Sequence, residues 1–501
     1  MREDYLKILE QYDEQMAETA RSAMNAAETA FPESVPDALV CAVMPNLSYY
    51  VEWTLEQALT GGIRRLYFLA RDGYLMYRMA SELCASRGLS IECRYLYGSR
   101  YAWRIPWYHL DWDGCLEKVC LDGLYVSFLS MMERAGLGTG DALQIASRYW
   151  PECSKDELDK KIRERIPRAR LTEWKERLRE DQSFRERVEQ LSRTAYESTI
   201  GYLRQEGLFE EIRYGLVDSG WVGSIQVTLE KLLESAGCPA KPEGYYYGLY
   251  SLPDGADASR FHACYFSPCR NLKNKVYFNN CLYECIYSSP EGSCMGYAWQ
   301  DGDEMRNGEW KKGFWRPVLA AERAGSRNKR RTKKRPNREK IQITEAVLEL
   351  WMKSYQQIVK TGGTFVLGKS GTKNSGKRSL LCQRALWKRL MCRPDVREAE
   401  YFGEYRFSDD VGGEERKQAA EALSDVDLKE MHIGRRLLHM AGIGTAGSGR
   451  GSAWMEGSIV RNGRHVEREL RNETIHKYLL YGGKELGERV KRFKGMGKRK
   501  G

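Results

Sequence analysis

The sequence lacks long hydrophobic runs, and no uninterrupted apolar stretch approaches the ~20 residues that a membrane-spanning helix requires. The first residues, MREDYLKILEQYDEQM, have the pattern of a charged helix and not that of a secretory signal peptide. Both absences argue against secretion and against a spanning helix. We therefore expect a cytoplasmic protein.

Metal-binding patterns are also missing. The 14 cysteines include no C-x-x-C pair, and the six histidines show no paired ligand spacing. Scattered cysteines in a long chain without an export signal indicate reduced thiols. The densest group of thiols is Cys264, Cys269, Cys281, Cys285 and Cys294. Five thiols could hold a metal, but small buried side chains are the favoured interpretation.

The composition is that of a globular protein, with 42% apolar and 30% charged residues. The net charge of +11 is concentrated in 322–340 and in 491–501. Both segments lack apolar periodicity, so a solvated linker and tail are favoured. The alternative is contact with anionic lipid headgroups at the inner face of the membrane, or with RNA. No motif for a specific nucleic acid is present.

Strand, turn and helix patterns alternate along the first part of the chain. An apolar run at 66–69 leads through a turn at 70–73 into a helix, and a second strand follows and ends at Gly98. Two strands around one helix favour a parallel sheet. The sheet is expected to resume at 213, after a long run of charged helices. We therefore expect an α/β fold with a Rossmann-like parallel sheet.

Changes in charge and in apolar periodicity divide the chain into units. A length of about 150 residues per domain serves as a guide to their number. The expected units are an N-terminal helical segment (1–40), an α/β core (41–111 and 213–300), a helical insertion (112–212), a basic linker (301–340), a smaller, mainly helical C-terminal unit (341–460) and a basic tail (461–501).

Ligands of parallel α/β sheets bind at the carboxyl ends of the strands, where backbone N–H groups at helix N-termini face anions. The turn after the first strand holds Arg71, Asp72 and Gly73. Gly73 allows the backbone to approach a ligand closely, and Arg71 has the guanidinium that forks onto a phosphate. Asp72 is a candidate for acid/base work or for magnesium binding.

A later strand ends in a second glycine-containing turn, with Asp218 as a candidate catalytic acid and magnesium ligand. Gly220, Gly223 and Ser224 are candidate phosphate-binding residues there, and Ser99, Arg100 and Arg104 are further candidates after the neighbouring strand. Asp and Ser are also common helix N-caps, and Gly is common in turns, so a purely structural role would explain these residue types equally well. Packing of arginine stems on Tyr101 and Trp103 would explain the arginines.

Several long segments carry a resemblance: YFLARDGYLMYRMA, YLYGSRYAWRIP, YGLVDSGWVGSIQ and YECIYSSPEGSCMGY. Over most of 40–300 the chain resembles bacterial proteins described as HAD-superfamily hydrolases of surface-polysaccharide gene clusters, found alongside glycosyltransferases. That chemistry needs DxDG[TV], with a nucleophilic aspartate first. Ala70 stands at that position before Asp72, whereas Asp218 keeps it but has Gly220 in place of the second acid.

The layout is also similar to that of type I phosphoribosyltransferases. Arg71 to Gly73 would correspond to their pyrophosphate loop and 218–224 to their PRPP loop. The usual adjacent acidic pair is here Asp218-Ser219, and the Thr-Gly-x-Thr run is absent. Both resemblances imply phosphate esters and magnesium.

These patterns predict an enzyme of surface-polysaccharide biosynthesis that hydrolyses or transfers a phosphate ester on a phosphorylated sugar or nucleotide-sugar. The alternatives are a degenerate module that binds a phosphosugar or a glycosyltransferase without turnover, and a phosphoribosyltransferase-like transferase.

Overall fold

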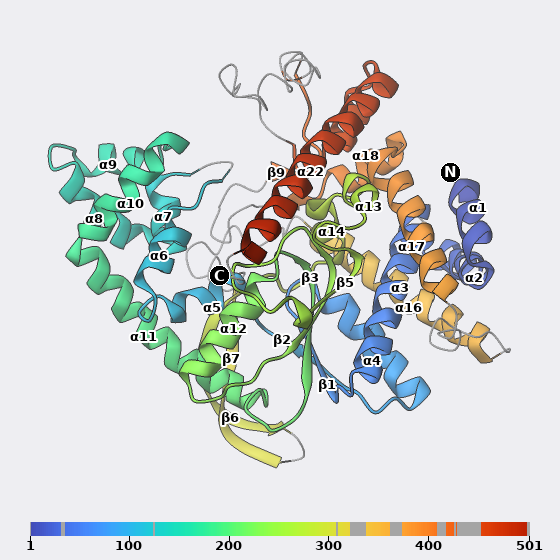
Figure 1. Cartoon of the computed structure of the whole chain (residues 1–501), viewed down its shortest axis with the longest axis horizontal. Helices are drawn as coiled ribbons and strands as arrows, with labels where there is room; N and C mark the ends of the chain where they lie inside the picture. The colour runs from blue at the N-terminus through green and yellow to red at the C-terminus, as the bar shows by residue number, and fades with distance from the viewer. Residues whose placement is uncertain are drawn as a thin grey trace.

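Five parallel strands form the centre of the chain in the order β2-β1-β3-β4-β5 (Figure 1). The computed structural model describes residues 2–31, 36–123, 126–306, 309–320, 337–360, 373–407, 417–424, 427 and 452–497. The strands are β1 (Arg65–Leu69), β2 (Glu92–Leu96), β3 (Tyr214–Trp221), β4 (Glu243–Leu249) and β5 (Phe261–Phe266). The predicted Rossmann-like α/β class is confirmed at this level. The order reverses between β1 and β3, which makes their carboxyl ends the switch point of the sheet.

Side chains of the central strands are buried on both faces of the sheet, as the short apolar runs predict. In β1, Leu66 and Phe68 join one hydrophobic core, and Tyr67 and Leu69 join another. This division follows from the alternation of side chains along a strand. The sheet therefore lies between two helical layers.

Helices before and after β1 cover one face, and helices that follow β2 and β3 cover the other (Figure 1). The first layer contains α3 (Met44–Thr60) and α4 (Tyr74–Arg87), which contact each other. The second contains α5 (Arg100–Trp107), α11 (Gln182–Gln205) and α12 (Ser224–Ser235), with α5 in contact with both partners.

A run of helices separates β2 from β3. Its shorter helices enclose a core of their own that includes Phe128, Trp174 and Phe184. They are α6 (Trp112–Val119), α7 (Phe128–Arg134), α8 (Thr139–Tyr149), α9 (Lys155–Lys161), η2 (Arg168–Arg170) and α10 (Leu171–Glu180). The long helix α11 returns the chain to the sheet.

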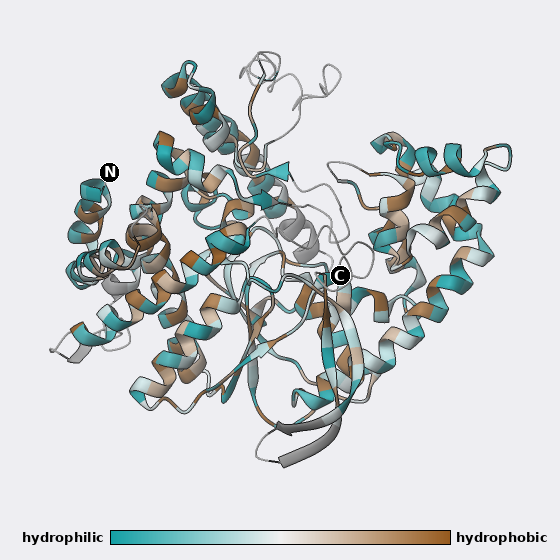
Figure 2. Cartoon of the chain, turned by 180° about the vertical axis from the view of Figure 1, so that it is seen from behind, coloured by the Kyte–Doolittle hydropathy of each residue, from teal (hydrophilic) through white to brown (hydrophobic). Residues whose placement is uncertain are grey.

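Helices from the two ends of the chain share one core with the sheet. They are α1 (Arg2–Tyr12), α2 (Glu14–Ala30), η1 (Leu39–Val43), α16 (Arg338–Lys360), α17 (Lys373–Trp387), η5 (Lys388–Cys392) and α18 (Val396–Gly403). The next helix, α21 (Met455–Asn462), packs on α18 in a smaller core. Trp351 Nε1 donates to Ser48 Oγ at 2.9 Å. Figure 2 shows brown and teal alternating along these helices, as expected for helices with one apolar side.

The chain after β5 continues in regular elements. Two short helices, α13 (Leu272–Val276) and α14 (Asn280–Tyr287), lead into an antiparallel hairpin of β6 (Cys294–Arg306) and β7 (Glu309–Leu319). The hairpin occupies the start of the range expected to be a linker, and 321–336 lie outside the described residues.

The range expected to be a basic tail contains a 32-residue helix, α22 (Val466–Gly497). Its Lys477 is buried and donates to Glu456 Oε1 of α21 at 2.5 Å. This contact fixes the helix on the body. No described helix has the length and apolar character needed to cross a membrane.

Replacing Trp351 by alanine tests the shared core. Trp351 is fully buried, so the cavity and the lost contact with Ser48 are expected to lower the free energy of unfolding by about 3–5 kcal/mol. Urea unfolding followed by circular dichroism measures the change. Val396→Ala, at an exposed position of the neighbouring α18, is the control and should change it by less than about 0.5 kcal/mol. A Trp351→Ala value as small as the control would contradict the shared core.

Candidate functional site

The turns after β1 and β3 lie side by side at the carboxyl edge of the sheet. Phe68 of β1 is the register partner of Val217 of β3. The strands are parallel, so the residues that follow these partners emerge at the same edge. Asp72 and Asp218, which are 146 positions apart in sequence, therefore face one site.

Asp72 is buried and both of its carboxylate oxygens are bonded. Its Oδ1 accepts a hydrogen bond from Arg71 Nε at 2.9 Å, and its Oδ2 accepts one from Ser219 Oγ at 2.9 Å. The bond to Ser219 joins the turn after β1 directly to β3. Asp72 thus holds the two turns together.

Glu284 of α14 is a second buried acid in the site, and the sequence analysis did not select it. Its Oε2 accepts from Arg71 Nη2 at 3.0 Å, and its Oε1 accepts from Trp221 Nε1 at 2.6 Å. Burial raises the pKa of Glu284, the charge of Asp72 raises it further, and Arg71 opposes both effects. Arg71 therefore bridges two carboxylates that come from different elements.

Asp218 is the acid without a guanidinium bound to it among the described residues. Burial, followed by the charges of Asp72 and Glu284, raises its pKa to about 7, while the backbone N–H of Ser219 and the charge of Arg100 oppose the rise. Its side chain is still partly exposed. Near neutral pH this carboxyl is therefore able to give or take a proton.

Backbone geometry explains the glycines. Gly220 has φ +105°, and a Cβ there would lie 2.6 Å from the carbonyl oxygen of Gly248. Gly223 has φ +74° and is the N-cap of α12, of which Ser224 is the first residue. A Cβ on Gly73 would lie 2.6 Å from the Leu69 carbonyl oxygen. Close packing against the strands thus requires glycine at Gly73 and Gly220, whereas Ser224 opens the helix N-terminus that faces the edge.

The third predicted turn, after β2, contains a serine with a structural role and two arginines that add positive charge. Ser99 caps α5: its Oγ accepts from Ala102 N at 2.9 Å and donates to the Cys294 carbonyl at 2.7 Å. Arg100 and Arg104 lie one helical turn apart on α5 and make no hydrogen bond or ion pair with any residue that the structure describes.

Positive charge accumulates beside these two arginines. The pKa of Arg104 is lowered by burial and then by the charge of Arg100. The pKa of Lys118 on α6 is lowered by burial, then by Arg104, and also by Lys231 of α12. Lys231 has a partial counter-charge in Asp111, at 3.9 Å. Cations that lower one another's pKa favour a bound anion, because an anion relieves their repulsion.

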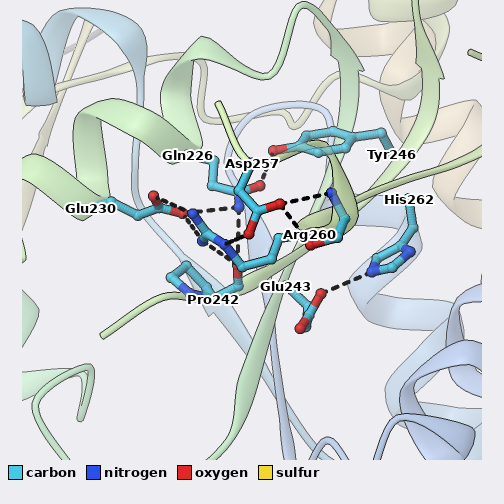
Figure 3. A network of polar contacts seen from close by, with 9 residues as sticks. Gln226, Glu230, Pro242, Glu243, Tyr246, Asp257, Arg260 and His262 are labelled. Carbon is cyan, nitrogen blue, oxygen red and sulfur yellow. Dashed lines mark hydrogen bonds and ion pairs between the residues drawn. The ribbon is translucent and has the colours of Figure 1, made fainter. Parts of the chain in front are cut away.

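Another polar network, on the side of α12, supports the turn that precedes this helix (Figure 3). Arg260 forms an ion pair with Glu230, with Nη2 to Oε2 at 3.0 Å. Gln226 donates to the Pro242 carbonyl at 2.9 Å and accepts from the Tyr246 hydroxyl at 2.7 Å. These bonds hold α12 against β4 and so fix the turn that precedes α12.

The described residues contain no group of three or more His, Cys, Asp or Glu side chains placed to hold a metal. Both oxygens of Asp72 are engaged, so Asp218 is the carboxylate with free coordination capacity. One carboxylate fits magnesium only when a phosphate substrate and water supply the other ligands. In the cysteine group, burial raises the pKa of the Cys264, Cys285 and Cys294 thiols to about 12, which disfavours the thiolate form.

The sequence matches no protein-family model and no curated protein. The resemblances to HAD hydrolases and to phosphoribosyltransferases therefore remain hypotheses. What is established is a Rossmann-like α/β protein with a cluster of acids and arginines at its switch point.

Asp218→Asn tests the raised pKa. Because the folded-state pKa of Asp218 is above the ordinary value of 3.8, ionisation of its carboxyl destabilises the folded state. This cost in stability is absent below pH ~4, grows from pH ~4 to ~7 and then levels off. The neutral amide has no such cost. The free energy of unfolding of the variant minus that of the wild type should therefore be larger at pH 8 than at pH 4. Urea unfolding at both values measures this change.

The matched control is Asp254→Asn, at an exposed acid in the loop after β4. Its difference from the wild type should stay constant over the same range. A constant difference for Asp218→Asn as well would show that its carboxyl titrates normally.

Proposed function

We propose that this edge of the sheet binds a phosphorylated sugar or nucleotide-sugar, and that Asp218 acts as general acid or base in hydrolysis or transfer of the phosphate ester. The observation that carries the proposal is a partly exposed carboxyl with a pKa of about 7 beside Arg100, whose guanidinium makes no hydrogen bond or ion pair with a described residue. A catalytic group works best when its pKa is near the working pH.

The cations of α5 suit the phosphate. Arg100 and Arg104 present two guanidinium groups on one helix face, and a guanidinium binds phosphate oxygens in a bidentate manner. The N-terminus of α12, at Ser224, adds backbone N–H groups that favour an anion. Arg71 is already bonded to two acids, so its role in the proposal is to position Asp72 and Glu284.

The proton transfer is assigned to Asp218 alone. Asp72 and Glu284 stay bonded to Arg71, Ser219 and Trp221. Burial, followed by the charges of these two acids, keeps the Asp218 carboxyl protonated up to about pH 7 by raising its pKa. A protonated Asp218 donates to the leaving oxygen, and the carboxylate then accepts a proton from water or from an acceptor hydroxyl. Magnesium, if bound by Asp218 and the phosphate, would supply charge neutralisation.

Two alternatives rest on the same residues. The engagement of Asp72 and Glu284 in fixed bonds leaves one carboxyl for chemistry, which favours a module that binds a phosphosugar or a glycosyltransferase without turnover. A phosphoribosyltransferase-like reaction would place PRPP on the turn of 218–224. A cytoplasmic role in surface-polysaccharide assembly belongs to the proposal and rests on the sequence resemblance.

The test is a thermal-shift and turnover screen with phosphosugars, sugar nucleotides, PRPP and simple phosphate esters, each with and without magnesium. A ligand at ~100 times its dissociation constant should add ~2.7 kcal/mol of stability. Arg104→Gln should weaken binding about ten- to hundredfold, because a charge-assisted contact is lost. Asp218→Asn should leave binding of the responsive ester measurable and lower its turnover about 10²-fold or more.

The control is Arg193→Gln, at an arginine of α11 with a side chain that is 65% exposed. It should bind like the wild type. Binding without turnover in the wild type would favour the alternative of a non-catalytic binding module. If no phosphate compound stabilised the protein, the proposed phosphate site would be wrong.

A further inference from the structure

Helix α22 carries an unusual amount of exposed apolar surface. Among the described residues, four of the ten large hydrophobic side chains that are strongly exposed lie on this helix: Ile475, Leu479, Leu486 and Val490, with exposed fractions of 40–65%. Single exposed apolar residues are common on proteins, but several on one element mark an interaction surface.

These four side chains form one stripe. Their positions differ by four, seven and four residues, and at ~100° per residue they fall within an arc of about 60°. The helix has 32 residues, so the stripe has room to lie along a flat surface. We refer to it as the α22 stripe.

The charges beside the α22 stripe are all positive. Arg471 and Arg489 fall on the same side of the helix, are exposed, and make no ion pair with a described residue. The five acids of α22 lie farther from the stripe. Glu469 and Glu473 are buried, and Glu485 pairs with Lys275 of α13 at 2.7 Å. Glu467 and Glu488 lie about 80° or more around the helix from the nearest stripe residue.

The opposite side of α22 is fixed to the body. Tyr481 stacks on Tyr250 with ring centroids 5.4 Å apart, and Lys477 is bonded to Glu456. The helix therefore cannot turn to bury its stripe without breaking an aromatic contact and a buried ion pair. Within the described part of the chain, the stripe is thus an apolar surface that stays exposed.

We propose that the α22 stripe docks on the surface of an anionic lipid membrane. An amphipathic helix with basic flanks lies in the headgroup region with its apolar side inward. A second copy of this chain fits less well, because its matching stripe also carries cations and offers no acid to Arg471 or Arg489. Beyond Val490 the sequence reads KRFKGMGKRKG, and each basic residue of this segment adds attraction to an anionic surface.

Vesicle flotation of the full chain tests the proposal. Vesicles of phosphatidylcholine alone are compared with vesicles in which one third of the lipid is phosphatidylglycerol. Binding is expected only to the anionic vesicles and should fall at high salt. Leu479→Gln combined with Leu486→Gln should weaken it about tenfold or more, because the apolar contact is lost while the net charge is unchanged.

The matched control is Leu110→Gln with Leu121→Gln, two exposed leucines outside α22. This variant should bind like the wild type. Arg471→Gln with Arg489→Gln should weaken binding about fivefold for each charge removed. Circular dichroism of each variant verifies that the fold is retained.

Three results would overturn the proposal. The first is equal binding by the α22 double leucine variant and the wild type, which would assign any lipid contact to the basic segment at 322–340. The second is no binding to anionic vesicles. The third is a dimer in solution that the α22 leucine variant dissociates, because the stripe would then be a contact between copies.

Discussion

The site depends on one guanidinium between two buried carboxylates. Arg71 binds Asp72 at 2.9 Å and Glu284 at 3.0 Å, and the charges of these acids raise the arginine pKa further above its ordinary value. Two adjacent buried acids without this cation would repel each other and take up protons. Removing one member of such a buried ion-pair group lowers the free energy of unfolding by more than the whole group contributes to it, because an unpaired charge is left buried.

The same bridge sets the charge of the rest of the edge. Burial first, and then the charges of the two carboxylates that share one cation, raise the pKa of the third acid, Asp218, to about 7. On the side of α5, Arg100 and Arg104 make no hydrogen bond or ion pair with a described residue, although the charge of Arg100 reaches Asp218 and Glu284. Acids and cations thus meet at one edge of the sheet, which is an arrangement suited to moving a proton onto an anionic substrate.

The sequence was sufficient for the parts of the fold that local pattern controls. Apolar runs followed by glycine-containing turns gave β1 and β3 and hence the parallel sheet with Asp72 and Asp218 on one edge. Glu284 was beyond such reasoning, because it lies on a short helix 212 positions after Asp72 and reaches the site only through tertiary packing. Its signal was present as the acid within YECIYSSP, but a single acid among aromatic residues has no pattern of its own.

Predictions from composition were wrong where contacts of buried residues determine the structure. The range after 461 was expected to be a tail because of its basic content, yet α22 is anchored there by Lys477 and Glu456, a contact between two elements that no periodicity reveals. In the same way, Ser99 has the sequence context of a phosphate ligand but both hydrogen-bonding functions of its hydroxyl are used within the fold. A residue type indicates what a side chain is able to do, whereas the partners already bonded to it determine what capacity remains.

The carboxyl edge of the sheet also explains why the candidate site and α22 are neighbours. Tyr250, on which Tyr481 stacks, directly follows β4, and the Glu485 carbonyl accepts from Cys269 Sγ, which follows β5. The loops after β4 and β5 therefore carry α22, while the turns after β1 and β3 carry the acids (Figure 1).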